Sequence, residues 1–162
     1  MSAEVGTVGA CVVGLQRSRG GVPKHAVDRA MVTVDGMEGD WQRERRFHGG
    51  PDRALCIYSM ELIDALAAEG HPISAGSVGE NVTVRGVVWP LVRPGARLLL
   101  GDVEVEITSF TVPCKTIAGA FLDGRSVRIS EKVNPGWSRV YARVLRGGAV
   151  AVGDAVELVA QV

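Results

Sequence analysis

The chain has 162 residues and a mass of 17.1 kDa, which suits a single domain, and 46% of its residues are apolar, which is enough for an ordinary buried core. Eighteen basic residues balance eighteen acidic ones, so no overall field favours nucleic acid or an anionic membrane as partner. No stretch approaches the ~18 apolar residues that span a bilayer, and Glu4 stands where a secretory signal would be basic. We therefore expect one soluble, cytoplasmic domain over residues 1–162.

The first half of the chain predicts short strands and one helix. Glycine is abundant, with 21 residues, and helix-period stretches are scarce, which favours strands joined by tight turns. Strands are predicted at 5–15 and 26–34, and a buried strand at 54–58. The clearest helix then begins with Ser59 as its N-cap and ends at Gly70. Its apolar stripe consists of Leu62, Ile63, Leu66 and Ala67.

The second half predicts hairpins. Strands at 97–100 and 103–107 flank a Gly101-Asp102 turn, and their alternating residues give one buried and one solvated face. Residues 149–152 and 156–158 show the same pattern around Gly153-Asp154, which predicts a second hairpin. Between the two, a short helix at 116–122 follows Pro113, and a strand is predicted at 140–145.

The three cysteines are too far apart to form a C-x-x-C pair, so each is judged alone. Cys11 and Cys56 lie in apolar strand runs, which predicts inert packing. Cys114 lies where a strand ends and a helix begins, and adjacent Lys115 together with the helix dipole would favour its thiolate. The alternative is a small buried residue that fills space after the strand.

The loop 16–24 is a candidate anion site. Arg17, Arg19 and Lys24 have no acid between them, and Gly20 and Gly21 let the backbone approach a ligand closely. The alternative is a solvated loop with basic side chains. Neither a P-loop nor a dinucleotide-binding glycine pattern occurs in the sequence.

A second basic stretch covers residues 43–53. Here His48 or Arg53 could bind an anion, or His48 could be a turn residue and Arg53 could pair with Asp52. The histidines lack the spacing of a zinc site, which argues against a zinc hydrolase.

Two further groups of polar residues flank predicted strands. Glu80 and Asn81 stand at a strand entrance, where we favour a structural role in tying loops together. Arg139 and Arg143 are offset by even steps from Tyr141, so they would share one strand face, as a basic wall or as a solvated exterior.

Nine segments, taken in order, resemble the MOSC domain family, in particular its stand-alone bacterial members related to proteins that confer resistance to N-hydroxylated purine bases. The segments are Gly20-Gly21-Val22-Pro23-Lys24, Gly39-Asp40, His48-Gly49-Gly50-Pro51-Asp52-Arg53-Ala54, Ser59-Met60-Glu61, Glu69-Gly70-His71-Pro72-Ile73, Gly79-Glu80-Asn81-Val82-Thr83, Gly95-Ala96-Arg97-Leu98, Pro113-Cys114, and Tyr141-Ala142-Arg143-Val144-Leu145 with Gly153-Asp154. They run across nearly the whole chain.

The resemblance implies a mainly β fold with short helices, built on a strongly bent mixed sheet or β-barrel of the MOSC type. It implies that Cys114 is the protein ligand of molybdenum in a molybdenum-pterin cofactor, or a sulfur carrier. Lys24 and Arg53 look like the groups that would hold the cofactor's phosphate or pterin. The matching positions His48, Asn81 and Arg143 are further cofactor-binding candidates, and whether His48, Glu80 and Asn81 contact the ligand or brace the pocket stays open.

Three functions are compatible with this resemblance and with the local patterns. The first is a molybdenum-dependent reductase of N-hydroxylated compounds, served by a separate electron-donor protein. The second is a sulfur carrier or cofactor-delivery module, in which Cys114 takes a persulfide from a sulfur donor. The third is a metal-free cysteine enzyme or a structural β domain. Pyridoxal phosphate is not expected, because no desulfurase domain fits in this length, and the sequence leaves the substrate and oligomeric state open.

Overall fold

The computed structural model describes residues 9–40 and 50–159, and within these ranges the chain is mainly β. Eleven strands, one α-helix and four short 3₁₀ helices are present in the described residues. The expectation of a mainly β fold with short helices and a large mixed sheet is therefore confirmed. No helix in the described part of the chain is long and apolar enough to cross a bilayer.

Eight strands form one large sheet in the order β11-β7-β8-β9-β5-β6-β1-β2. Their bounds are β1 Cys11–Arg17, β2 His25–Val27, β5 Leu55–Ser59, β6 Val82–Arg85, β7 Arg97–Leu100, β8 Val103–Phe110, β9 Val140–Arg146 and β11 Val156–Val159. The sheet is mixed because β5 and β6 run parallel, whereas its other neighbouring strands run antiparallel. A second sheet contains β10 (Gly148–Ala151), β3 (Arg29–Thr33) and β4 (Gly36–Met37).

The large sheet bends so that β11, at one edge, approaches the start of β1. The Val12 N–H donates to the Asp154 carbonyl at 2.9 Å, and the Val156 N–H donates to the Ala10 carbonyl at 3.0 Å. An isolated bridge also joins Cys11 to Ala155. These contacts join the chain ahead of β11 to the start of β1, although no continuous ladder closes a barrel among the described residues.

Strand β5 lies within the core, and helix α2 (Met60–Ala68) covers it with one face. All five residues of β5 are buried, as expected for a strand covered on both faces. The Ser59 hydroxyl accepts the Leu62 N–H at 3.3 Å, which confirms the predicted N-cap. Ile63 and Leu66 are buried, but Ala67 is exposed, so the buried stripe of the helix is narrower than predicted.

The β7–β8 hairpin is confirmed, and the second predicted hairpin is wrong. β10 pairs with β3 and β11 pairs with β7, so the two C-terminal strands belong to different sheets. Alternation identifies a strand and its faces but not its partner. Around Gly153, which has a φ of 97°, the turn directs the chain from one sheet to the other.

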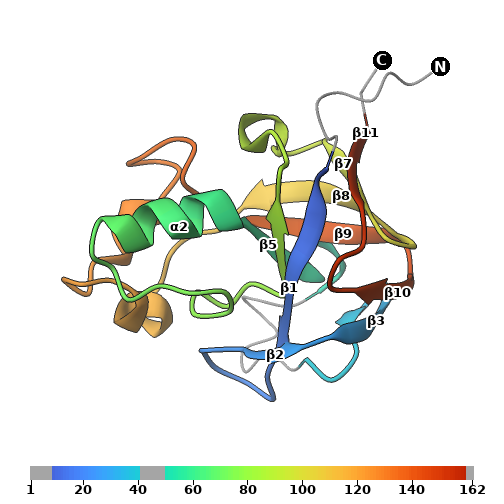
Figure 1. Ribbon diagram of the computed structural model, residues 1–162, viewed down its shortest axis with the longest axis horizontal. Coiled ribbons are helices and arrows are strands. Elements are labelled where there is room, and N and C mark those ends of the chain that lie inside the picture. The colour runs from blue at the N-terminus through green and yellow to red at the C-terminus, as the bar shows by residue number, and fades with distance from the viewer. Residues whose placement is uncertain (1–8, 41–49, 160–162) are drawn as a thin grey trace.

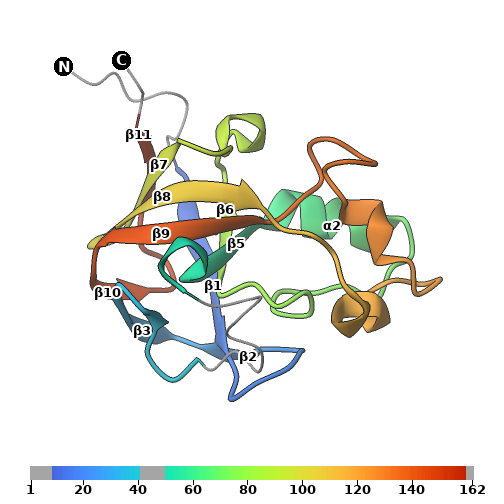
Figure 2. The ribbon, with the colours of Figure 1, turned by 180° about the vertical axis from the view of Figure 1, so that it is seen from behind.

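The remaining helices are short turns of 3₁₀ type, η1 (Pro51–Arg53), η2 (Trp89–Leu91), η3 (Lys115–Ala120) and η4 (Ser126–Ile129). The short helix predicted at 116–122 corresponds to η3. Figures 1 and 2 show η3 and η4, in orange, on the same side of the molecule as α2, with β3 and β10 toward the opposite side. We call residues 111–137 the 3₁₀ lobe.

Gly36 offers a test of the close packing against Ala54, the residue that follows η1. Its φ is 117°, and a Cβ at this position would lie 2.6 Å from the Ala54 carbonyl oxygen, directly after Arg53. We expect Gly36→Ala to cost about 3 kcal/mol in the free energy of unfolding, from the positive φ and the clash together. Gly136→Ala is the matched control, because Gly136 has a φ of 93° and open space around it. Urea unfolding that gives equal losses for the two variants would contradict the close contact.

Candidate functional site

Cys114 lies at the junction that the sequence predicted. β8 ends at Phe110, and Cys114 immediately precedes η3 in extended conformation, with φ −129° and ψ 174°. Its thiol is half-buried and contacts the Thr116 hydroxyl. Because η3 is a six-residue 3₁₀ helix, the dipole facing the thiol is weaker than that of the helix we expected.

Tyr141 lies within electrostatic range of Cys114 and carries the Arg53 side chain on its ring. The Arg53 guanidinium carbon lies 5.4 Å from the centre of the Tyr141 ring, a cation–π contact. Burial, with smaller contributions from Cys56 and Cys114, raises the pKa of Tyr141 to about 12, against the lowering effects of Arg139 and Arg53. The phenol is therefore neutral at physiological pH, and its ring supports the exposed guanidinium of Arg53.

Cys56 lies next to Tyr141 on the neighbouring strand, in an environment that disfavours its thiolate. It pairs with Tyr141 across the β5–β9 register and is buried. Burial raises the pKa of its thiol to about 11. The expected inert packing of Cys56 agrees with this setting.

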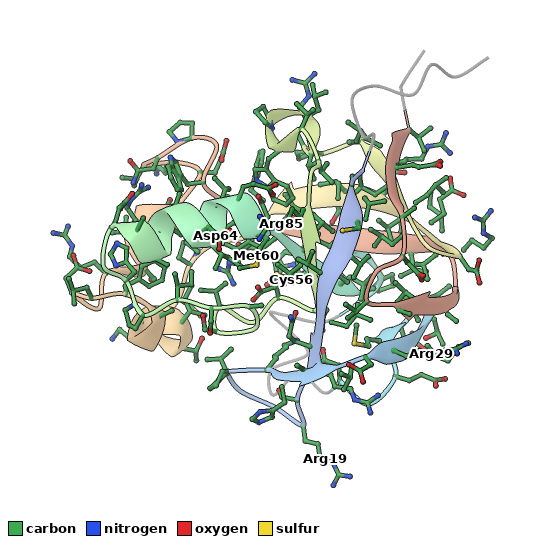
Figure 3. The ribbon with its side chains drawn as sticks, viewed as in Figure 1. Arg19, Arg29, Cys56, Met60, Asp64 and Arg85 are labelled. Atoms are coloured by element: carbon green, nitrogen blue, oxygen red, sulfur yellow. The ribbon has the colours of Figure 1, made fainter. Side chains whose placement is uncertain are left out.

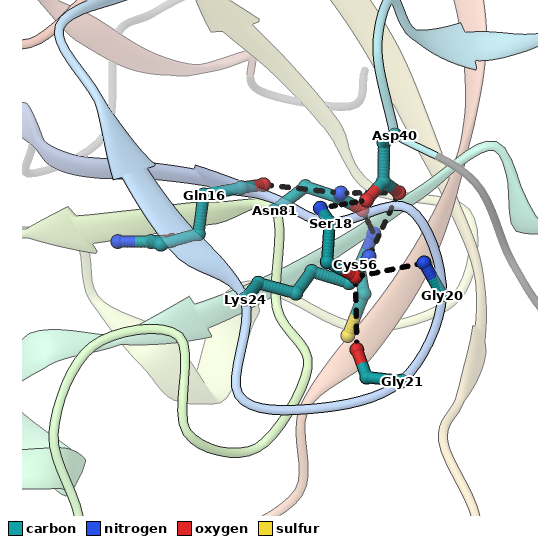
Figure 4. A network of polar contacts seen from close by, with 8 residues as sticks. All are labelled: Gln16, Ser18, Gly20, Gly21, Lys24, Asp40, Cys56 and Asn81. Carbon is teal, nitrogen blue, oxygen red and sulfur yellow. Dashed lines mark hydrogen bonds and ion pairs between the residues drawn. The ribbon is translucent and has the colours of Figure 1, made fainter.

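A buried network of polar contacts joins the basic loop, residues 16–24, to the large sheet (Figure 4). The Lys24 ammonium lies 2.8 Å from Asp40 Oδ2, and the two side chains are 7% and 5% exposed. The Asn81 amide donates to the same Asp40 oxygen at 2.8 Å, and Asn81 Oδ1 accepts the Cys56 N–H at 3.0 Å. Asp40 Oδ1 accepts the Ser18 N–H at 3.0 Å. We call Ser18, Lys24, Asp40, Cys56 and Asn81 the polar knot.

Three predicted site residues therefore have different surroundings. Lys24 and Asn81 are engaged inside the knot, whereas Arg53 is exposed. These contacts do not test cofactor binding, so the roles assigned to Lys24, Asn81 and Arg53 stay predictions. His48 lies outside the described residues.

The two arginines near Tyr141 do not form the common strand face that we expected. Arg139 is buried, and its Nη1 donates to the Val78 carbonyl at 2.7 Å. Arg143 is partly exposed and pairs with Glu106 at 3.1 Å and with Asp52 at 3.4 Å. Arg139 precedes β9, so strand alternation does not set its direction.

Glu80 has the structural surroundings that we favoured for it. Its carboxyl group is fully buried, and Oε2 lies 3.1 Å from the Thr83 hydroxyl. Burial raises its pKa, against the lowering effects of hydrogen bonds and of Arg139. The residue braces the loop ahead of β6.

The 3₁₀ lobe is fastened to the end of α2. The Arg128 guanidinium donates to both Glu69 carboxylate oxygens, at 3.1 and 2.8 Å, and stacks 3.9 Å from the centre of the Trp137 ring. His71 Nδ1 accepts a backbone N–H of the lobe at 3.0 Å. The Ser126 hydroxyl donates to the Cys114 carbonyl at 3.3 Å, so the fastening reaches the cysteine itself.

The comparisons with known proteins agree with this architecture. The family model of the MOSC domain matches residues 44–157. This chain belongs to the MOSC domain family. The match covers β5 to β10 and the first two residues of β11, and it includes Arg53, Cys114 and Tyr141.

Relatives of this MOSC domain come from bacteria. It is 31% identical over 137 residues to the uncharacterised protein YflK of Bacillus subtilis, covering 84% of this chain and 61% of that protein. It is 31% identical over 137 residues to the protein YiiM of Escherichia coli, covering 82% and 60%. The chain thus spans about 60% of the length of these curated relatives.

A solved structure of the YUAD protein of Bacillus subtilis superposes on the whole MOSC domain. The TM-score is 0.76, with 100% of each chain covered and 20% sequence identity. This similarity establishes the fold alone.

Sequence reasoning gave no role to two side chains that the structure brings into the site. Asp40 belongs to a matching segment, yet nothing local indicated that it would join Lys24 and Asn81. The sequence used Tyr141 only as the reference for the strand face of Arg139 and Arg143. In the structure, its ring makes a cation–π contact with Arg53. In the described residues, no three His, Cys, Asp or Glu side chains cluster as a metal site.

Selective alkylation tests the different settings of two cysteines. At pH 8 we expect iodoacetamide to modify Cys114 in the folded protein and to spare Cys56, because Cys56 is buried and its thiol pKa is raised to about 11. Peptide mass spectrometry reports each site, and Cys114→Ser removes the fast-reacting peptide. Equal rates for the two cysteines in folded protein would contradict the described burial.

The Lys24–Asp40 pair gives a second prediction. We expect Asp40→Asn to cost about 3 to 5 kcal/mol in the free energy of unfolding, because it leaves a buried ammonium without its anion. Asp64→Asn is the matched control, since Asp64 pairs with Arg85 at the surface with side-chain exposures of 53% and 46% (Figure 3), and should cost less than about 1 kcal/mol. Urea unfolding with similar losses would show that the Asp40 pair is not buried in solution.

Proposed function

We propose that this MOSC domain holds a molybdenum-pterin cofactor through the Cys114 thiolate and reduces N-hydroxylated compounds. The observation that carries the proposal is the position of Cys114. Of the three cysteines, it is the one that lies outside a strand, and its side chain is half-exposed. The family resemblance, which implies a molybdenum ligand at this cysteine, supports the proposal.

The residues around Cys114 fit such a group chemically. A thiolate is a soft ligand that suits molybdenum held by a dithiolene. Thr111 Oγ1 and Arg139 Nε are buried without a hydrogen-bond partner among the described residues, and the Thr111 N–H donates to the Arg139 carbonyl at 3.1 Å. Unpaired buried polar atoms are rare, so a polar ligand next to these strand ends would satisfy them. Arg53 adds an exposed cation for an anionic group.

When bound, the cofactor would supply the two-electron redox chemistry that the side chains of this domain lack. The balanced reaction converts R–NHOH, two electrons and two protons into R–NH₂ and water. A separate electron-donor protein provides the electrons. The chain's own contribution is to fix the Cys114 sulfur at the end of β8 and to hold the Arg53 guanidinium on the neutral Tyr141 ring.

One observation favours a second function, transfer of sulfur from a Cys114 persulfide to a partner. Val112, two residues before the cysteine, is 82% exposed, so the segment carrying the thiol is accessible to another protein. In this case the sulfur would arrive from a sulfur donor and leave to an acceptor, and no metal would be needed.

Metal analysis separates the two functions. We expect protein from cofactor-producing cells to contain molybdenum and to reduce an N-hydroxylated purine base with a supplied electron donor, and we expect Cys114→Ser to lose both properties. Cys11→Ser is the matched control, because Cys11 is also half-buried but lies within β1. Wild-type protein without molybdenum at any stoichiometry would refute the reductase. Addition of one sulfur atom to Cys114 after incubation with a sulfur donor would then support the carrier.

A further inference from the structure

A hollow opens on the outer side of the loop between β1 and β2. Its volume is about 320 Å³, and it is lined by Arg17, Ser18, Arg19, His25, Val27 and Gly39. This volume falls at the lower end of the range of small-molecule sites. The hollow is distinct from Cys114 and its neighbours, because none of the residues in the Cys114 neighbourhood lines it.

The lining is cationic. Arg17 and Arg19 contribute its positive charge, and no acidic side chain belongs to the lining among the described residues. Asp40, the acid that contacts this loop, is 5% exposed and directs its oxygens to Lys24, Asn81 and the Ser18 N–H inside the polar knot. The knot therefore neutralises Lys24 and leaves the charge of Arg17 and Arg19 on the outer side.

Arg17 is held in place before any ligand arrives. Its Nη1 donates to the Glu38 carbonyl at 3.0 Å, which leaves the other guanidinium N–H groups for a further partner. A Cβ at Gly39 would lie 3.0 Å from Arg17 Nη1 and 3.1 Å from Cζ, so glycine at this position lets the guanidinium pack against the backbone. A cation that is already positioned loses less entropy when it binds an anion.

Arg19 supplies the complementary, adaptable element. It is exposed, and Figure 3 shows its side chain extending from the loop into solvent, away from Arg29. A fixed guanidinium beside a movable one suits an anion with several oxygens, because each can donate paired hydrogen bonds.

We infer that this hollow is a binding site for the phosphate group of a small molecule, with Arg17 as the fixed and Arg19 as the movable cation and His25 at its edge. The expected binding of pyrophosphate does not require molybdenum in the protein. It explains why two arginines and a close-packed glycine meet on the outer side of a loop whose lysine is already neutralised.

Calorimetry with cofactor-free protein tests the site. We expect saturable binding of pyrophosphate and of adenosine 5′-monophosphate, no binding of adenosine, and weakening by salt. Arg19→Gln should weaken pyrophosphate binding about tenfold, the loss of one charge-assisted contact. Arg29→Gln, the same change at an exposed position that does not line the hollow, should leave binding within twofold, about the effect of a distant surface charge.

Two outcomes would overturn the inference. One is the absence of saturable pyrophosphate binding, and the other is equal weakening by Arg19→Gln and Arg29→Gln, which would show general attraction to basic protein. Cys114→Ser should bind pyrophosphate as the wild type does, so a failure of the molybdenum proposal leaves this result intact. Molybdenum content of Arg19→Gln identifies the source of the phosphate: an unchanged content indicates a separate phosphorylated molecule, and a reduced content indicates the cofactor's own phosphate.

Discussion

The arrangement of this domain depends on the hydrogen bonds of the Asn81 side chain. Its carboxamide reaches three separate segments: it accepts from the Cys56 N–H in β5 and donates to the Gln16 carbonyl in β1 and to the Asp40 carboxylate. Each of these groups is remote from water, so leaving any of them unpaired would cost more than the bond itself contributes. Asp40 extends the network to Lys24, and the loop between β1 and β2 is thereby fixed on the large sheet.

Five of the basic residues around this network fall into three groups with different environments. Lys24 is balanced by a buried carboxylate, and Arg139 is enclosed near Cys56, Tyr58 and Tyr141, whose ionisation it influences. Arg17, Arg19 and Arg53 face outward. A chain without net charge can in this way hold local anion sites, because pairing rather than composition decides where charge is available.

Local patterns were sufficient to predict the elements but not all their partners. The Ser59 cap, the helix after it and the β7–β8 hairpin follow from contacts within a few residues along the chain, and the sequence states them directly. β10 and β11 belong to different sheets because each pairs with a strand that is distant in the sequence. The alternation of apolar and polar residues does not identify that partner strand. The same limit applies to the site: Cys114 was found from the order of matching segments, whereas Asp40 acquired its place from residues 16 and 41 positions away.

The fastening of the 3₁₀ lobe has a consequence for how the thiol can be tuned. Glu69 and Arg128 are surface residues with no chemistry of their own, yet the chain from Glu69 through Arg128 and the lobe to Ser126 ends on the Cys114 carbonyl. Loss of these contacts would alter the environment of the Cys114 sulfur without a change in any residue next to it. A substitution at Glu69 can therefore change the environment of the Cys114 thiol while the residues next to it remain the same.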